Sequence, residues 1–199
     1  MRCILFAAAM LICAGATGNL ASAGDIQGQV HARPNRHQKD AVVYIDAIEG
    51  KAFEAPEAHA VMDQKRLVFV PHVLPVLVGT TVDFPNSDRV LHNVFSPDET
   101  AEKFNLGTWP QGEIRSYTFK RVGSAVMLCN VHPEMEAYVV VLPTPFFSKT
   151  DAEGNFRIEG VPPGAYTLKV WQKRDLKAAP QQVTVPEKGS VAVEFTLKR

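Results

Sequence analysis

The stretch CNVHPEM at residues 129–135 separates two predicted β-strands. The first strand ends at Cys129 and the second begins near Ala137, so the stretch forms a tight loop between strands. A thiolate, an imidazole and a thioether follow one another at spacings of three, as Cys129, His132 and Met135. Side chains on so short a loop can converge on one point. The loop is therefore a candidate for holding a metal ion.

A fourth ligand has to come from another part of the chain. His92 is the natural candidate because it also lies near a predicted strand end. Two histidines, one cysteine and one methionine suit copper, since thiolate and thioether favour Cu(I) while imidazole accepts both oxidation states. Zinc typically uses several cysteines or histidines and has little use for methionine. The sequence thus predicts one copper ion held by His92, Cys129, His132 and Met135.

Each of these residues also has a simpler interpretation. Alone, Cys129 would be a small buried apolar residue, His92 a hydrogen-bonded histidine, His132 a loop residue and Met135 a core residue that fills a gap. Their combination in one pattern favours the copper site. The other histidines show no such convergence and are predicted to be structural or surface residues: His31, His37, His59 and His72.

The first 23 residues differ from the rest of the chain. Arg2 gives a positive start, Ile4 to Ala16 are almost wholly apolar, and Ala21 to Ala23 form a small-residue cleavage site. The apolar run is shorter than the roughly 20 residues of a membrane-spanning helix. We therefore expect a signal peptide over residues 1–23, a periplasmic or secreted protein, and no membrane span in the mature chain. A membrane anchor or, because of Cys13, a lipoprotein are the alternatives.

Cleavage after Ala23 removes Cys3 and Cys13 and leaves Cys129 as the only cysteine. An internal disulfide is then impossible. In an oxidising compartment an unpaired thiol needs burial, a partner chain or a metal ion. This requirement singles out Cys129 as a residue with a specific role.

The composition and the apolar pattern predict a globular all-β protein. Apolar residues make up 46% of the chain, and 21 Lys and Arg balance 21 Asp and Glu, which gives no whole-chain reason to expect a nucleic acid partner. From Val191 to Leu197 apolar residues alternate with others, as in a sandwich with one buried face. Strands are predicted near 27–32, 41–47, 66–70, 74–78, 80–84, 91–95, 115–120, 124–129, 137–142, 155–159, 165–171, 181–185 and 190–197.

Residues 57–143 resemble the cupredoxins, the type 1 blue copper proteins. The resemblance rests on FVPH at 69–72, VGTTVDFPN at 78–86, LHNVF at 91–95 and a ligand loop similar to that of the plastocyanin- and amicyanin-like members. Bacterial plastocyanin-like proteins labelled methylamine utilization protein are similar as well. The resemblance implies a Greek-key sandwich with copper near one end and His132 at the exposed edge. It also implies that Asn93 ties the two ligand loops together by hydrogen bonding.

Residues 24–56 and 144–199 resemble the carboxypeptidase regulatory-like, transthyretin-type β domain. The resemblance rests on TDAEGNFRI at 150–158, VPPGAYTL at 161–168, and early strands at 26–30 and 40–45. These early strands precede the cupredoxin region, so we expect the cupredoxin to be inserted in this small β-sandwich. A simple tandem, with residues 24–56 belonging to the cupredoxin, is the alternative.

These features predict a one-electron carrier that cycles between Cu(II) and Cu(I) and is not an enzyme. A redox donor and acceptor are expected to dock transiently near His132, with Val90, Val131 and Pro133 as contacts. We expect a monomer. The alternatives are a copper carrier or buffer without redox turnover, a copper enzyme, which would need further histidine clusters, and an envelope binding module that uses the transthyretin-like domain.

Overall fold

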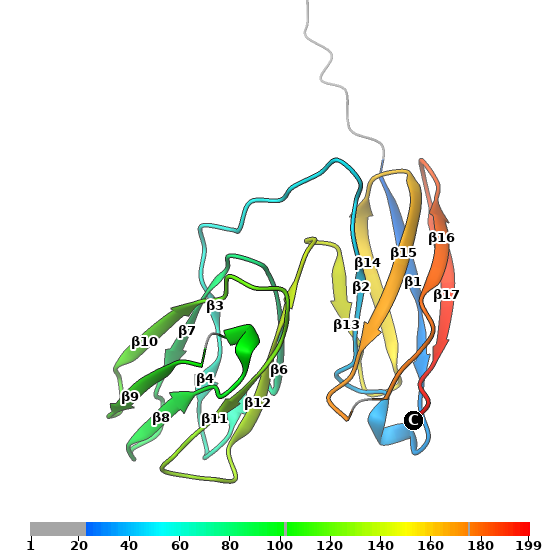
Figure 1. Cartoon of the computed structure of the whole chain (residues 1–199). Coiled ribbons are helices and arrows are strands. Elements are labelled where there is room, and N and C mark those ends of the chain that lie inside the picture. The colour runs from blue at the N-terminus through cyan, green and yellow to red at the C-terminus, as the bar shows by residue number, and fades with distance from the viewer. Residues whose placement is uncertain (1–22, 102, 175) are drawn as a thin grey trace, which may run out of the picture.

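The computed structural model describes residues 23–101, 103–174 and 176–199, so the predicted signal peptide lies outside the described residues apart from Ala23. The described residues form β-strands and two short 3-10 turns, Asn35–His37 and Glu99–Ala101, without an α-helix. The predicted all-β class is confirmed. Nowhere in this part of the chain is there a helix of the length and apolar character needed to cross a membrane. Figure 1 shows two β units side by side.

The first unit contains strands β3 to β12 and carries the predicted metal ligands. A five-stranded sheet in the order β6-β12-β11-β8-β9 faces a three-stranded sheet in the order β10-β7-β3, and β4 and β5 form a separate pair. Their bounds are β3 Ala60–Val61, β4 Asp63–Gln64, β5 Phe69–Val70, β6 Val73–Leu77, β7 Thr81–Pro85, β8 His92–Phe95, β9 Asn105–Trp109, β10 Ile114–Thr118, β11 Gly123–Leu128 and β12 Glu136–Leu142.

The core of this first unit forms because apolar residues alternate along its strands. In β11, Ala125 and Met127 point into one buried cluster, and Cys129 continues the same period of two. Phe84, Trp109 and other large side chains fill the space between the two sheets. The ligand loop after Cys129 is therefore attached to a fully packed sheet.

The second unit is formed by strands from both ends of the chain. One sheet has the order β14-β1-β17 and the other β13-β2-β15-β16, with a shared apolar core that includes Ile26, Leu168 and Phe195. The bounds are β1 Gly24–His31, β2 Val42–Ile45, β13 Phe147–Lys149, β14 Asn155–Val161, β15 Gly164–Trp171, β16 Gln181–Val185 and β17 Ser190–Thr196.

The chain leaves the second unit after β2 and returns to it at β13. Strand β1 pairs with β14 and in parallel with β17, while β2 pairs with β13 and β15. In Figure 1 the outgoing connection, residues 46–59, crosses along the upper edge of the molecule. Strands from before and after the first unit thus pair with one another in the second unit. The exact domain limits at residues 57 and 143 stay predictions.

A small apolar cluster joins the two units. Val42 from the second unit packs with Val73, Val140 and Leu142 from the first. Beside this cluster the Lys149 ammonium donates a hydrogen bond to the Val73 carbonyl at 3.1 Å, and Lys173 Nζ lies 2.6 Å from His72 Nε2. The interface therefore combines buried apolar contacts with polar contacts at its margin.

The predicted strand at 66–70 is wrong over residues 66–68. Arg66 and Leu67 adopt positive φ angles of 59° and 60°, and residues 65 and 68 form a turn with reciprocal backbone hydrogen bonds. Only Phe69 and Val70 belong to β5. An apolar run in the sequence is compatible with a strand and also with a turn that another part of the chain stabilises. Here the Asp88 carboxylate stabilises the turn, because it accepts hydrogen bonds from the Arg66 and Leu67 amides.

Four strands were not expected from the sequence: β3, β4, β9 and β13. Strands β3 and β4 have two residues each and β13 has three, too few to show a period of two. Strand β9 contains Gly107 at φ 76° and pairs with β8 through an irregular register. Its glycine interrupts the alternation on which strand prediction depends.

Candidate metal centre

The four predicted ligands come from three places on one sheet. His92 is the first residue of β8, Cys129 directly follows β11, and His132 and Met135 lie in the loop before β12. His92 and Met135 are fully buried, Cys129 is 3% exposed, and His132 is half-buried. Because β8 and β11 are neighbours in the sheet, the fold brings the upstream histidine to the cysteine.

Three of the predicted ligand atoms converge on one point. The ligand atoms of His92, Cys129 and His132 lie within 4.8 Å of one another. The Nδ1 atoms of the two histidines are 3.1 Å apart, and Cys129 Sγ lies 4.0 Å from His92 Nδ1. Met135 belongs to the same buried cluster as Cys129, and its amide donates to the His132 carbonyl at 3.0 Å.

Asp88 fixes which nitrogen of His92 faces the other ligands. Its Oδ2 atom lies 3.0 Å from His92 Nε2, on the far side of the ring from the site. An ionised carboxylate only accepts hydrogen bonds, so Nε2 carries the proton and Nδ1 presents a lone pair toward Cys129 and His132. A carboxylate behind a histidine is a common arrangement for orienting a metal-binding imidazole.

The surroundings of Asp88 favour its ionised form. Burial alone would raise its pKa, but hydrogen bonds from the Leu67 amide, His92 and the Arg66 amide lower the pKa below its ordinary value. The Arg66 and Leu67 amides lie 2.6 and 2.9 Å from the two carboxylate oxygens. One carboxylate therefore holds both the turn at 66–67 and the ring of His92.

Asn93 connects the two ligand-bearing segments. Its backbone amide donates to Cys129 Sγ at 3.4 Å, and its side-chain oxygen accepts from the Asn130 amide at 3.2 Å. Its Nδ2 atom donates to Asn105 Oδ1 at 2.8 Å and to the Gly107 carbonyl at 2.7 Å. The N–H group that points at the sulfur helps to fix its position beside His92.

Asp88 and Asn86 were not predicted from the sequence to take part in the metal centre. Asn86 is 1% exposed and donates from Nδ2 to the carbonyls of Val90 and Trp109, while its Oδ1 accepts from the Asp88 amide. These bonds shape the loop that ends at His92. The spacing of Asp88 four residues before His92 is a weak signal, because a carboxylate near a histidine is common.

The remaining histidines lie apart from this centre. His59 Nδ1 is 2.9 Å from Asp83, His31 is 3.8 Å from Glu194, and His72 contacts Lys173. In the described part of the chain, the His92, Cys129 and His132 group is the one cluster of such side chains with metal-binding geometry.

The donor set fits copper. It offers two imidazole nitrogens, one thiolate and a nearby buried thioether, with no carboxylate oxygen among the facing atoms. Imidazole, thiolate and thioether are the donors of sites that hold copper in both oxidation states. A trio of two nitrogens and one sulfur is also a poor match for magnesium or calcium, which take oxygen ligands.

Comparison with known families identifies part of the second unit. Residues 133–198 match the carboxypeptidase regulatory-like domain, which confirms that resemblance for the C-terminal part of the chain. The match begins at residue 133 and so includes β12, which pairs with β11 and β6 of the first unit. No curated protein matches the chain.

Several solved structures are similar to about half of the chain. The copper-containing nitrite reductase of Thermus scotoductus SA-01 is 28% identical over 50% of this chain and 25% of that chain, with a TM-score of 0.42. A reduced mutant of amicyanin is 25% identical over 50% and 97% of the two chains, with a TM-score of 0.40. A purple cupredoxin from Nitrosopumilus maritimus is 27% identical over 41% and 98%, with a TM-score of 0.37.

The chain spans only a quarter of the nitrite reductase, and all three TM-scores are below 0.5. The function proposed below therefore rests on the geometry of the metal centre.

Proposed function

We propose that this protein is a one-electron carrier with a single type 1 copper ion held by His92, Cys129, His132 and Met135. The observation that carries the proposal is the convergence of one ligand atom each from His92, Cys129 and His132 within 4.8 Å, with the two histidine Nδ1 atoms 3.1 Å apart. His92 and the Cys129 loop lie far apart in sequence. When bound, copper supplies a one-electron change between Cu(II) and Cu(I).

The surroundings of the ligands suit electron transfer better than bond chemistry. His92, Cys129 and Met135 are at most 3% exposed, so the chain leaves little access for a substrate or for water. Asp88 and Asn93 hold the ligand segments through several hydrogen bonds. A site fixed in this way changes little in shape when its charge changes, which favours fast electron transfer.

His132 is the ligand that reaches the surface. It is half-buried, and the exposed side chains of Val90, Leu91 and Val131 belong to the same two ligand segments. We define His132 with these three residues as the metal edge. Transient redox complexes bury small interfaces, below about 1,200 Å² in total, and an apolar edge of this kind fits such a contact by a donor or an acceptor.

Export and the absence of catalysis belong to the same proposal. The signal-peptide pattern of residues 1–23 supports a periplasmic or secreted location. Enclosed ligands support a carrier of electrons over a copper enzyme. We also propose that the protein is a monomer. An electron carrier must dissociate from each partner after it has exchanged an electron.

The test is to load the protein with Cu(II) and record its visible spectrum. We expect an intense blue thiolate-to-copper charge-transfer band that disappears in Cys129→Ser. Two buried methionines give a matched pair: Met135→Leu should shift the band and the reduction potential, whereas Met127→Leu in β11 should change neither. Colourless binding, or a band that survives Cys129→Ser, would contradict the proposal.

A second measurement separates an electron carrier from a copper carrier. We expect rapid electron exchange with a redox protein and slow loss of copper to a metal-free acceptor protein. Prompt copper transfer without electron exchange would instead indicate that the protein delivers copper to other proteins.

A further inference from the structure

One end of the second unit carries a group of cationic side chains that the metal centre does not explain. They come from the segment before β2, from the β15–β16 connection and from the segment after β17. Five are exposed and Lys173 is half-buried. We define this basic surface as Arg33, Lys39, Lys173, Arg174, Lys198 and Arg199.

The basic surface is continuous. Arg33, Arg174, Lys198 and Arg199 line a groove of about 640 Å³, and Lys39, Lys173 and Arg174 line a smaller hollow beside it. Both hollows share His37 and Arg174, so the cations surround one connected depression. This depression extends to the junction between the two units, because His72 of the first unit lines the smaller hollow.

The positive charge of this surface is largely uncompensated by neighbours. Some other cations of the second unit are paired, as Arg157 is with Asp25 and Lys169 with Asp46. Within the described residues, no member of the basic surface forms an ion pair with a carboxylate. Asp40 lines the smaller hollow, and its carboxylate pairs with Lys149. Asp175 lies outside the described residues. Clustered unpaired charges create a potential that reaches about 8–10 Å into solution at physiological salt.

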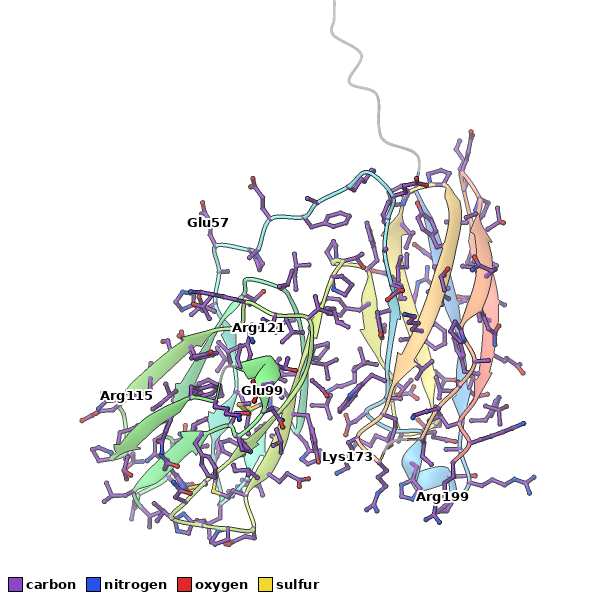
Figure 2. The ribbon with its side chains drawn as sticks, in the orientation of Figure 1. Glu57, Glu99, Arg115, Arg121, Lys173 and Arg199 are labelled. Atoms are coloured by element: carbon purple, nitrogen blue, oxygen red, sulfur yellow. The ribbon has the colours of Figure 1, made fainter. Side chains whose placement is uncertain are left out.

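The basic surface and the metal edge face the same side of the molecule. In Figure 1 the loop between β11 and β12, which carries His132, and the chain end after β17 both lie at the lower edge. Figure 2 shows Lys173 at the lower end of the junction between the units and Arg199 near the lower end of the second unit. A partner that approaches from this side meets both surfaces.

We propose that the basic surface docks an acidic redox protein and thereby brings its redox group to the metal edge. The proposal rests on the proposed electron-carrier function and adds the charge of the partner and the role of the second unit. Opposite charges raise the rate of encounter, while the small apolar metal edge forms the contact through which electrons pass. A redox protein fits better than a membrane, because the metal edge must also be approached closely.

The test compares two variants with the same change in net charge. The first reverses three members of the basic surface: Arg33→Glu, Arg174→Glu and Lys198→Glu. The control reverses three exposed lysines away from it: Lys51→Glu, Lys120→Glu and Lys188→Glu. In Figure 1 the connection that contains Lys51 and the β16–β17 turn that contains Lys188 lie at the upper edge.

The probes are an acidic and a basic c-type cytochrome, mixed with the copper-loaded protein in a stopped-flow instrument. At low ionic strength the first variant should react about tenfold more slowly with the acidic cytochrome, and the control variant less than about twofold more slowly. The difference should vanish at high salt. Equal slowing by both variants would overturn the proposal, because it would show an effect of net charge alone.

Binding without copper separates this inference from the proposed function. Metal-free protein should bind the acidic cytochrome in a chemical-shift titration, with the first variant weakened and the control unchanged. That result supports the docking surface even if the blue band is absent. If the first variant instead loses binding to vesicles of phosphatidylglycerol and phosphatidylcholine, with unchanged affinity for the cytochrome, the surface is a membrane site and the proposal is wrong.

Discussion

The two sandwiches of this protein use their buried polar side chains for different purposes. The core of the second unit is a single apolar cluster from Ile26 to Leu197. The first unit also buries polar side chains at its metal end, among them Asn86, His92 and Asn93. A buried polar group must be hydrogen-bonded to be tolerated, and these groups bond to the ligand-bearing segments. In the first unit buried polar groups position a site, whereas in the second unit the buried Thr144, Thr150 and Gln172 bond to backbone carbonyls of that unit itself.

The largest expected effect is on stability alone. Phe195→Ala in β17 removes a ring that is 1% exposed and should lower the free energy of unfolding by about 3–5 kcal/mol. Chemical denaturation followed through Trp171 of the second unit and Trp109 of the first measures this loss. The copper spectrum should not change. A shifted band in the folded variant would show that the second core also shapes the metal centre.

Asn93→Ala should affect both stability and the metal centre. The change removes the half-buried hydrogen bonds that Asn93 forms with the Asn130 amide and the Gly107 carbonyl, at a cost of about 0.5–1.5 kcal/mol each. Copper affinity should fall about 10- to 100-fold because the ligand segments are less well oriented. Competition with a chelator measures the affinity. If only stability changes, Asn93 is a packing residue like those of the second unit.

Asp88→Asn should act mainly on the metal centre. The amide no longer fixes the proton on His92 Nε2, so copper affinity should fall by about tenfold or more. Asp151→Asn in the second unit is the control, because hydrogen bonds from Asn155 lower the pKa of that carboxyl too. An equal loss of copper affinity in both variants would show that Asp88 has no specific role at the metal centre.

The smallest expected effect concerns the junction between the two units. Burial lowers the pKa of His72 below 6.5, and the Lys173 ammonium lowers it further, against the raising effect of Asp40 and Glu136. As the pH falls below about 6.5, the unfolded state takes up this proton before the folded state does. The free energy of unfolding should therefore decrease at acid pH.

Denaturation curves between neutral and mildly acid pH check this expectation. His72→Gln should flatten that part of the pH profile, whereas His31→Gln, at a half-exposed site in the second unit, serves as the control. A profile unchanged by His72→Gln would show that other groups cause the acid destabilisation.

The sequence was informative where the pattern is local. The loop from Cys129 to Met135 could be recognised because its three donor side chains lie within seven residues between two strong strands. The strand Ser190–Thr196 followed from its alternating apolar residues. Short strands such as β13, and β9 with its glycine, carry too little periodicity to be found in this way.

The sequence by itself determined the all-β class, the types of donor side chain and the resemblance of each region, because these depend on local composition and spacing. The tertiary structure decided that His92 faces Cys129, that Asp88 lies behind His92, and that the basic surface faces the same side as the metal edge. These relations join residues far apart in the chain. They follow from the order of strands in the sheets, which local periodicity does not specify.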